Sequence, residues 1–249
     1  MKVRGMETFG RYFSSFDECY CLIGGAALSL INEKRGGWSR ATKDLDVVVL
    51  LKGETPDFIR RLISFVKEAA YQQLSVSPNG CSYRFSDTGK KEFPEEIELF
   101  TKEQGIGRSL RGNLQHLSLN AEVSFSSIVL DSVYYDYIAE NREKDVVTYI
   151  RDYAIVPLKA KAYLENKALF DQKTPNIHEE TYKKHARDVI RFVEDFPVKK
   201  ILLPDPIKVD CHRFLDAIKT APFTIEEISG NSAYHLEDFA RLFTEDFLS

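Results

Sequence analysis

Residues 19–51 read CYCLIGGAALSLINEKRGGWSRATKDLDVVVLL, and they decide the fold of the first half of the chain. The short apolar run CYCLI predicts a strand, which ends at Gly24 and Gly25. The following AALSLINEK carries apolar residues at helical spacing and predicts a helix, while the valine-rich DLDVVVLL predicts a second strand. The stretch therefore predicts a strand, a glycine turn, a helix and a second strand that begins at Asp44 and Asp46.

The two glycines and the two aspartates suit a site for phosphate and metal. Gly24 and Gly25 have no Cβ, so the backbone can turn sharply and approach a ligand closely. The helix that starts near Ala26 directs its N–H groups and the positive end of its dipole at the same place, which favours a phosphate. Asp44 and Asp46 project from one face of a strand and repel each other unless a cation lies between them. Oxygen ligands suit Mg²⁺, so the stretch predicts a site for a nucleoside triphosphate and magnesium.

A third carboxylate completes this kind of site. Two metal ions about 3.5–4 Å apart can stabilise the attacking and leaving oxygens of phosphoryl-type transfer, and a further acid is needed to hold the second ion. The strand pattern EEIELFT places Glu98 on its polar face, which makes Glu98 the candidate. Glu96 shares that face, and Glu122 in the later run NAEVS is a further alternative. We therefore expect two magnesium ions on Asp44, Asp46 and one of these glutamates.

The rest of the sequence divides into a mixed part and a helical part. Up to residue 156 it shows a helix pattern from Pro56, a hairpin from CSYRF and EEIELFT, and a strand in NAEVSFSSIVLD. From Pro157 onwards it shows amphipathic helices only, such as PLKAKAYLENKALF and EETYKKHARDVIRFVED. We predict an α+β (mixed α/β) fold, with a mixed sheet flanked by helices in residues 1–156 and an all-α domain in residues 157–249.

Composition and charge exclude several classes of protein. The 249 residues carry a formal net charge of −4, which argues against extensive wrapping of nucleic acid, although residues 159–200 hold 10 Lys and Arg against 7 Asp and Glu. The four cysteines lack CxxC spacing and the five histidines lack HExxH, so no zinc site is expected. No run approaches the roughly 20 apolar residues of a membrane span, and no apolar signal segment opens the chain. We expect a cytoplasmic protein without a membrane partner.

The glycine and aspartate motifs resemble those of the nucleotidyltransferase superfamily that includes DNA polymerase β. Within it, the chain is similar to the AbiEii/AbiGii type of toxin-related nucleotidyltransferase over most of residues 20–195. LIGGAALSL and RATKDLDVVV resemble the first two motifs of that group, EIELFT its third-carboxylate strand, and AEVSFSSIVLD a later strand. LKAKAYLENKA and KKHARDVIRF resemble the signature of its helical domain.

This resemblance implies a fold, a reaction and a set of residue roles. An NTP and Mg²⁺ would bind between the sheet and the helices, with residues 157–249 closing the nucleotide cleft. The nucleotidyl group would pass to an acceptor on RNA, such as tRNA, or on a protein, and an antitoxin-like protein would be a partner. Either Lys159 or Lys161 would neutralise the triphosphate, and Asp188 would orient that lysine or contact the nucleotide. The implied roles are catalysis and metal binding by Asp44, Asp46 and Glu98, and nucleotide binding by Gly24, Gly25, Lys159, Lys161 and Asp188.

The same residues have ordinary structural interpretations. An Asp-x-Asp pair can be the solvated face of an edge strand, and Glu96 with Glu98 can be a charged edge that deters aggregation. Lys159 and Lys161 lie in a lysine-rich helix, and such a face is usually just solvated.

The sequence also supports a second function. Ala26 stands where many superfamily members have a hydroxyl residue, and the third acid is Glu rather than the commoner Asp. The alternative is a catalytically weak or inactive protein of the same fold that binds nucleotide or a partner. In the loop before Asp44, Arg40 and Lys43 either steer phosphate or RNA or balance the acidic pair, and Trp38 either stacks on a base or anchors the loop.

Overall fold

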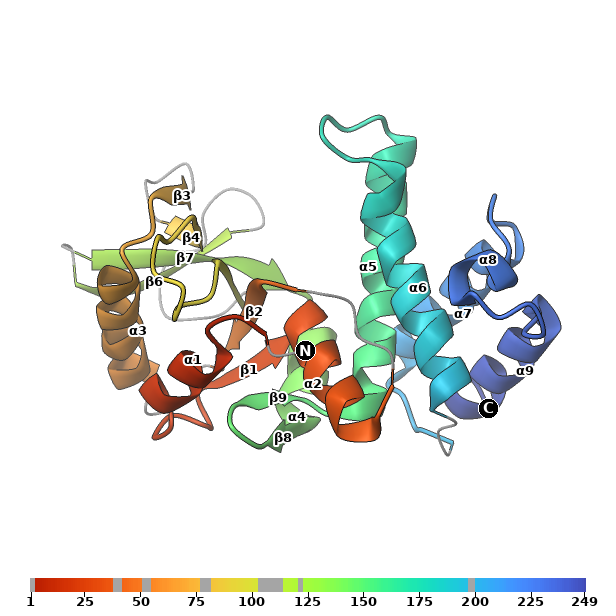
Figure 1. The fold of residues 1–249 in the computed structure, drawn as a ribbon, viewed down its shortest axis with the longest axis horizontal. Helices are drawn as coiled ribbons and strands as arrows, with labels where there is room; N and C mark the ends of the chain where they lie inside the picture. The colour runs from red at the N-terminus through yellow and green to blue at the C-terminus, as the bar shows by residue number, and fades with distance from the viewer. Residues whose placement is uncertain are drawn as a thin grey trace. The chain divides into compact units, whose positions relative to one another are not determined.

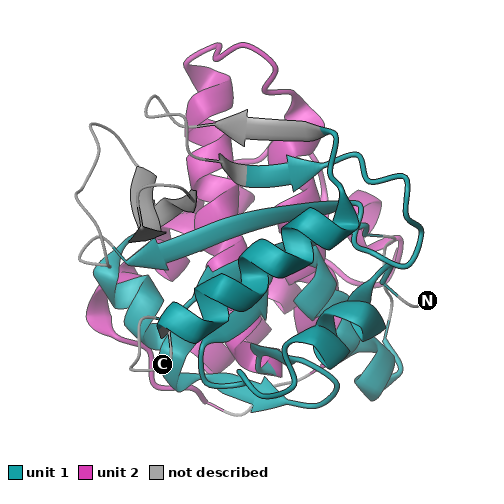
Figure 2. Cartoon of the chain, turned by 90° about the vertical axis from the view of Figure 1, so that its left-hand side faces the viewer, with its two compact units in different colours: residues 1–151 teal, residues 152–249 magenta. Residues whose placement is uncertain are grey.

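The structure is a computed structural model that describes residues 3–37, 42–50, 55–76, 82–102, 114–120, 123–196 and 200–249. The chain forms two compact units, Met1–Arg151 and Asp152–Ser249 (Figure 2). The end of the first unit precedes the boundary expected after residue 156, which lies inside helix α5 (Ile155–Asp171). Each unit is described by itself.

One mixed sheet organises the first unit, and within the described residues it contains nine strands. Their bounds are β1 Tyr20–Ile23, β2 Asp44–Val49, β3 Gln73–Val76, β4 Ser82–Ser86, β5 Glu96–Lys102, β6 Leu114–Asn120, β7 Val123–Leu130, β8 Arg142–Lys144 and β9 Thr148–Ile150. The strand order is β3-β4-β7-β5-β2-β1-β9-β8, with β6 paired to β7 and β4 also paired to β5. Because β1 and β2 run antiparallel while β2 and β5 run parallel, the predicted mixed sheet is confirmed.

Four helices accompany this sheet in the described part of the first unit. They are α1 Met6–Tyr12, α2 Gly24–Arg35, α3 Thr55–Ala69 and α4 Ser132–Glu140 (Figure 1). An aromatic cluster joins α1 and α3 to β1: the ring centroids of Phe9 and Phe65 lie 5.6 Å apart, and Tyr20 stacks on Phe58 at 5.9 Å. All four side chains are buried, and aromatic pairs of this kind contribute about 0.5–1.5 kcal/mol beyond their buried area.

The second unit is helical, as predicted. Its elements are η1 Asp152–Ala154, α5 Ile155–Asp171, α6 Glu179–Asp195, α7 Asp205–Lys219, α8 Ile225–Ser229 and α9 Leu236–Phe247 (Figure 1). Its core contains Tyr163 of α5 at the centre, with ring centroids 5.5 Å from Tyr182 of α6 and 5.2 Å from Phe214 of α7. Phe243 of α9 extends the cluster, with its ring centroid 5.6 Å from that of Phe214. Four helices therefore meet around one aromatic core.

The elements predicted from residues 19–51 are present, with small differences at their ends. The helix begins at Gly24 rather than near Ala26, because Gly24 adopts a left-handed conformation and the chain turns directly from the strand into the helix. Among the described residues, no helix is both long enough and apolar enough to cross a membrane.

Candidate active site

Strand register gathers four carboxylates on one face of the sheet. Across the antiparallel pair of β1 and β2, Asp46 lies opposite Ile23, the last residue before the glycine pair. Across the parallel pair of β2 and β5, Asp46 lies opposite Glu98 and Asp44 lies opposite Glu96. Directly paired residues in neighbouring strands point to the same side, so the four acids share one face. The first strand, the aspartate strand and the glutamate strand are therefore neighbours in the sheet.

Burial alternates along both acidic strands. On β2, Asp44 is exposed and Asp46 is half-buried, while Leu45 between them is fully buried. On β5, the two glutamates are half-buried, and Ile97 and Leu99 are fully buried on the opposite face. The apolar face of these strands supplies core packing, so the acidic face rests on a rigid part of the sheet.

Gly24 brings the start of α2 against the carboxylate of Asp46. Its φ is +68°, in the left-handed region, and a Cβ added there would lie 1.7 Å from Oδ2 of Asp46. A side chain at this position would be strained and would also displace the carboxylate, so the position requires glycine. Gly25 follows in the first turn of α2, where N–H groups lack intrahelical partners. The acidic face and the helix start therefore form one local site.

Arg84 of β4 lies beside the two glutamates and is not among the residues that the sequence singles out. It is the register partner of Glu98 across the antiparallel pair of β4 and β5. Its Nε and Nη2 both donate to Oε1 of Glu98, at 3.1 and 2.7 Å, and Nε lies 3.3 Å from Oε1 of Glu96. One guanidinium thus bridges both glutamates. No sequence signal identifies it, because the register of β4 against β5 depends on how the intervening residues 87–95 fold.

Burial and neighbouring charges shift the pKa values of Glu96 and Glu98. Burial raises the pKa of Glu98 above its ordinary value, and Glu96 and Asp44 add to the rise, while Arg84 opposes it. Burial likewise raises the pKa of Glu96, with Arg84 again opposing and both aspartates adding to the rise. The four carboxylates therefore interact with one another, and a positive charge on this face stabilises their ionised forms.

The donor chemistry suits magnesium, but the three predicted ligands do not converge. Carboxylate oxygens are the ligands that Mg²⁺ prefers. Among the residues that the structure describes, no group of three or more His, Cys, Asp or Glu side chains is placed to hold a metal ion. Glu98 directs one oxygen to Arg84, and Asp44 and Asp46 lie on the same face of the sheet beside the two glutamates. The part of Glu98 as a third ligand stays a prediction, and the alternative Glu122 lies outside the described residues.

The basic residue before the aspartates has an acidic partner of its own. Nζ of Lys43 lies 3.1 Å from Oε2 of Glu95, and Nη1 of Arg4 lies 3.1 Å from the same oxygen. Lys43 thus neutralises Glu95, a residue just outside the acidic face. Arg40 and Trp38, which the sequence analysis considers for phosphate or base contacts, lie outside the described residues.

The residues of the second unit that are predicted to contact nucleotide form ion pairs with other residues of that unit. Nζ of Lys159 on α5 lies 2.9 Å from Oδ2 of Asp188 on α6, and both residues are buried, with 4% and 3% exposed. Lys161 is half-buried and lies 3.2 Å from Glu165 and 3.5 Å from Asp210. Asp188 thus orients Lys159, and the contact of either lysine with nucleotide stays a prediction.

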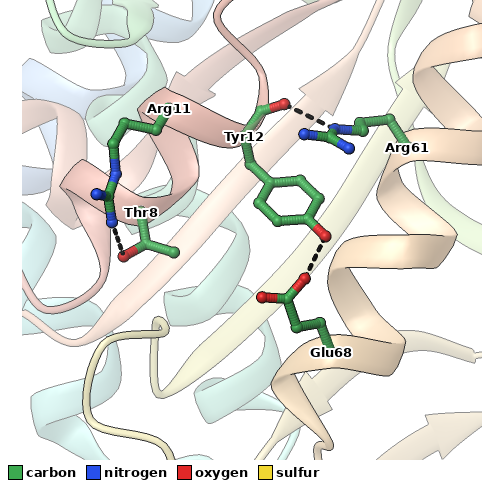
Figure 3. A pocket seen from close by; sticks show the side chains of 5 residues that line it. All are labelled: Thr8, Arg11, Tyr12, Arg61 and Glu68. Atoms are coloured by element: carbon green, nitrogen blue, oxygen red, sulfur yellow. Dashed lines mark hydrogen bonds between the residues drawn. The ribbon is translucent and has the colours of Figure 1, made fainter.

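A separate hollow of about 260 Å³ lies over α1 and α3. It is lined by Thr8, Arg11, Tyr12, Arg61 and Glu68 (Figure 3). The hydroxyl of Tyr12 donates to Glu68, Nε of Arg61 donates to the carbonyl of Tyr12 at 3.0 Å, and the guanidinium of Arg61 lies 3.9 Å from the centre of the Tyr12 ring. These side chains form hydrogen bonds and stacking contacts with one another, and none of them belongs to the acidic face.

Comparison with known proteins adds a distant structural likeness. No family model matches the sequence, and no curated protein matches it. Among solved structures, the chain is similar to the crystal structure of the Megavirus polyadenylate synthase, with a TM-score of 0.38 and 11% sequence identity over 86% of this chain. The match spans 37% of the polyadenylate synthase chain. A likeness this low defines neither an activity nor a substrate for this chain.

Proposed function

We propose that the first unit carries a nucleotidyltransferase site, which moves an NMP group from an NTP to an acceptor hydroxyl with Mg²⁺ on Asp44 and Asp46. The observation that carries the proposal is the contact between Gly24 and Asp46. A left-handed glycine that admits no Cβ places the first turn of α2 directly against a carboxylate of the Asp-x-Asp pair. A helix start suits a phosphate and the aspartates suit a cation, so the two halves of a nucleotide–metal site lie side by side.

Each residue of this site has a definite part in the proposed reaction. The backbone of Gly24 and Gly25 receives phosphate oxygens at the start of α2, and Asp44 and Asp46 hold the ion. When bound, magnesium neutralises the negative charge of the phosphates. The acceptor hydroxyl attacks the α-phosphorus, the bond to the leaving pyrophosphate breaks, and the hydroxyl proton passes to one of the carboxylates. Positioning and charge neutralisation are the main demands of such transfer, and a rigid sheet face meets them.

The finer assignments belong to the same proposal and rest on the sequence motifs. They are the AbiEii/AbiGii subtype, a tRNA or protein acceptor, an antitoxin-like partner and a cytoplasmic location. The contribution of Lys159 or Lys161 to triphosphate binding also belongs here. It too rests on the sequence motifs, and in the structure the ammonium group of Lys159 pairs with Asp188.

The test is a transfer assay on the whole chain. Labelled NTPs, Mg²⁺ and total RNA are incubated with the wild-type protein and with the double variant Asp44→Asn/Asp46→Asn. The matched control is Asp57→Asn, which changes an exposed aspartate of α3 paired with Arg60. We expect the control to transfer label like the wild type, and the double variant to lose about a hundredfold or more, because removing a metal site costs several kcal/mol of transition-state stabilisation.

Transfer that survives the double substitution at its wild-type rate would refute the proposal. Labelled protein recovered from the reaction reports transfer to the chain itself, and labelled RNA reports transfer to RNA. If calorimetry shows NTP affinity while no acceptor mixture releases pyrophosphate, the protein is a nucleotide-binding member of this fold class. The neutralisation of Glu98 by Arg84 is the observation that favours that second function.

A further inference from the structure

Three neighbouring strands place one cation and four anions in two rows. In the first row, Arg84 of β4 lies opposite Glu98 of β5, which lies opposite Asp46 of β2. In the second row, Glu96 of β5 lies opposite Asp44 of β2. Neighbouring strands are about 4.7–4.9 Å apart, so the backbone of Arg84 lies roughly 10 Å from that of Asp46, with the strand of the glutamates between them. The face thus has an arginine at one end and the Asp-x-Asp pair at the other.

The guanidinium of Arg84 already occupies one oxygen of Glu98. Oε1 of Glu98 accepts two hydrogen bonds from it, at 2.7 and 3.1 Å, and Oε1 of Glu96 lies 3.3 Å from the same Nε. The side chain of Glu98 is only 13% exposed, so water compensates little for a lost partner. A divalent ion on Oε1 would have to displace the arginine, and an ion on Oε2 would lie beside its fixed positive charge. Glu98 is therefore better placed to hold Arg84 than to hold metal.

We propose that Arg84 stands in for a second metal ion: its single positive charge is shared by Glu96 and Glu98, so that the site takes a single divalent cation on Asp44 and Asp46. The purpose of that cation rests on the proposed function, but the number of ions bound does not. Arg84 is thus a positioning residue, which sets the charge of the acidic face and the direction of the Glu98 carboxylate. A guanidinium supplies one fixed positive charge without an open coordination position, so the second ion of a two-metal mechanism is replaced rather than recruited.

The test counts Mn²⁺ ions on the full chain without nucleotide, by calorimetry and by electron paramagnetic resonance. Mn²⁺ accepts the same oxygen ligands as Mg²⁺. We expect one ion per wild-type chain, none on Asp46→Asn, and a second ion on Arg84→Met, in which Glu96 and Glu98 lose their cation. Arg60→Met is the matched control. It removes an exposed arginine of α3, which forms an ion pair with Asp57 and lies outside the acidic face.

A second variant keeps the test decisive if Arg84→Met fails to fold. Glu98→Gln should weaken Mn²⁺ binding by no more than about fivefold, the effect of removing one charge a strand away, whereas loss of a direct ligand should weaken it by about a hundredfold. Glu92→Gln, an exposed glutamate outside the acidic face, is its control. Thermal melting of each variant verifies folding before ions are counted.

Three results would overturn the inference: a wild-type chain that binds two ions or none, an Arg84→Met chain with unchanged ion number, and a Glu98→Gln chain that loses the ion. These outcomes are separable from the proposed function. A chain that binds one ion and gains a second with Arg84→Met, yet transfers no label, supports the role of Arg84 and refutes the transferase. A chain that transfers label but loses its ion with Glu98→Gln supports the transferase and refutes the role of Arg84.

Discussion

Substitution of Gly24 by alanine should disrupt the site more than the conformational strain of the change can explain. Gly24 has a φ of +68°, and the added Cβ would lie 1.7 Å from Oδ2 and 2.8 Å from Cγ of Asp46. Both distances are far inside van der Waals contact, so the carboxylate must turn away from the start of α2. We therefore expect Gly24→Ala to lose its divalent ion as well as stability.

The same helix supplies a matched control for the strain. Gly36, which follows the C-terminus of α2, has a φ of +75°, and no described atom lies within 4 Å of the Cβ that alanine would add there. A left-handed conformation costs an L-residue about 1–2 kcal/mol, so Gly36→Ala should lose roughly that amount of unfolding free energy. Gly24→Ala introduces the same strain and adds a steric cost of about 1–3 kcal/mol. Its total loss of unfolding free energy should therefore be about 2–5 kcal/mol.

Urea unfolding measures the free energy of both variants, and an Mn²⁺ titration measures the ion site. Gly24→Ala should be the less stable variant by more than about 1 kcal/mol and should bind Mn²⁺ at least about tenfold more weakly, while Gly36→Ala keeps wild-type affinity. Equal losses of stability in the two variants, together with unchanged Mn²⁺ affinity in Gly24→Ala, would refute the claim that Asp46 lies against the helix start.

Two further predictions concern the second unit. Lys159→Met leaves Asp188 charged and buried, so it should lower the free energy of unfolding by about 3–5 kcal/mol, and the double variant Lys159→Met/Asp188→Leu should recover most of that loss in urea unfolding. The hydrogen bond with Glu226 raises the pKa of His235 above its ordinary value of 6.5. Its stabilisation is therefore complete below about pH 6.5 and is lost as the pH rises through the folded-state pKa. The midpoint of thermal unfolding should fall more between about pH 6 and about pH 9 for the wild type than for His235→Gln, and equal falls would contradict this assignment.

Local patterns predict much of the first unit's scaffold. The alternation of DLDVVV predicts that Asp44 and Asp46 share a face, because side chains on a strand alternate with a period of two. The glycine pair predicts a sharp turn between a strand and a helix, and Gly24 does adopt a left-handed conformation there. The amphipathic periodicity from Pro157 onwards predicts the helices of the second unit. Each of these signals involves residues close together in the chain.

The partners of the acidic side chains could not be predicted in this way. Glu98 follows Asp46 by 52 residues, and their pairing depends on β5 lying beside β2 in the sheet order. Arg84 meets Glu98 through the pairing of β4 with β5. A shift of that register by one residue would move the side chain of Arg84 to the other face of the sheet. The polar face of β5 makes Glu98 a candidate metal ligand, and the cation beside it comes from another strand, β4.

By itself, the sequence determined the strand, turn, helix and strand of residues 19–51, the helical character of the second unit and the side of the strand on which each acid lies, because these follow from the spacing of neighbouring residues. Only the tertiary structure decided that Asp46 lies against Gly24, that Arg84 bridges Glu96 and Glu98, and that Asp188 pairs with Lys159. The resemblance leaves the partner of Asp188 open between Lys159 and Lys161. Those contacts join segments whose approach is set by strand register and helix packing, which depend on the apolar cores of the two units as wholes.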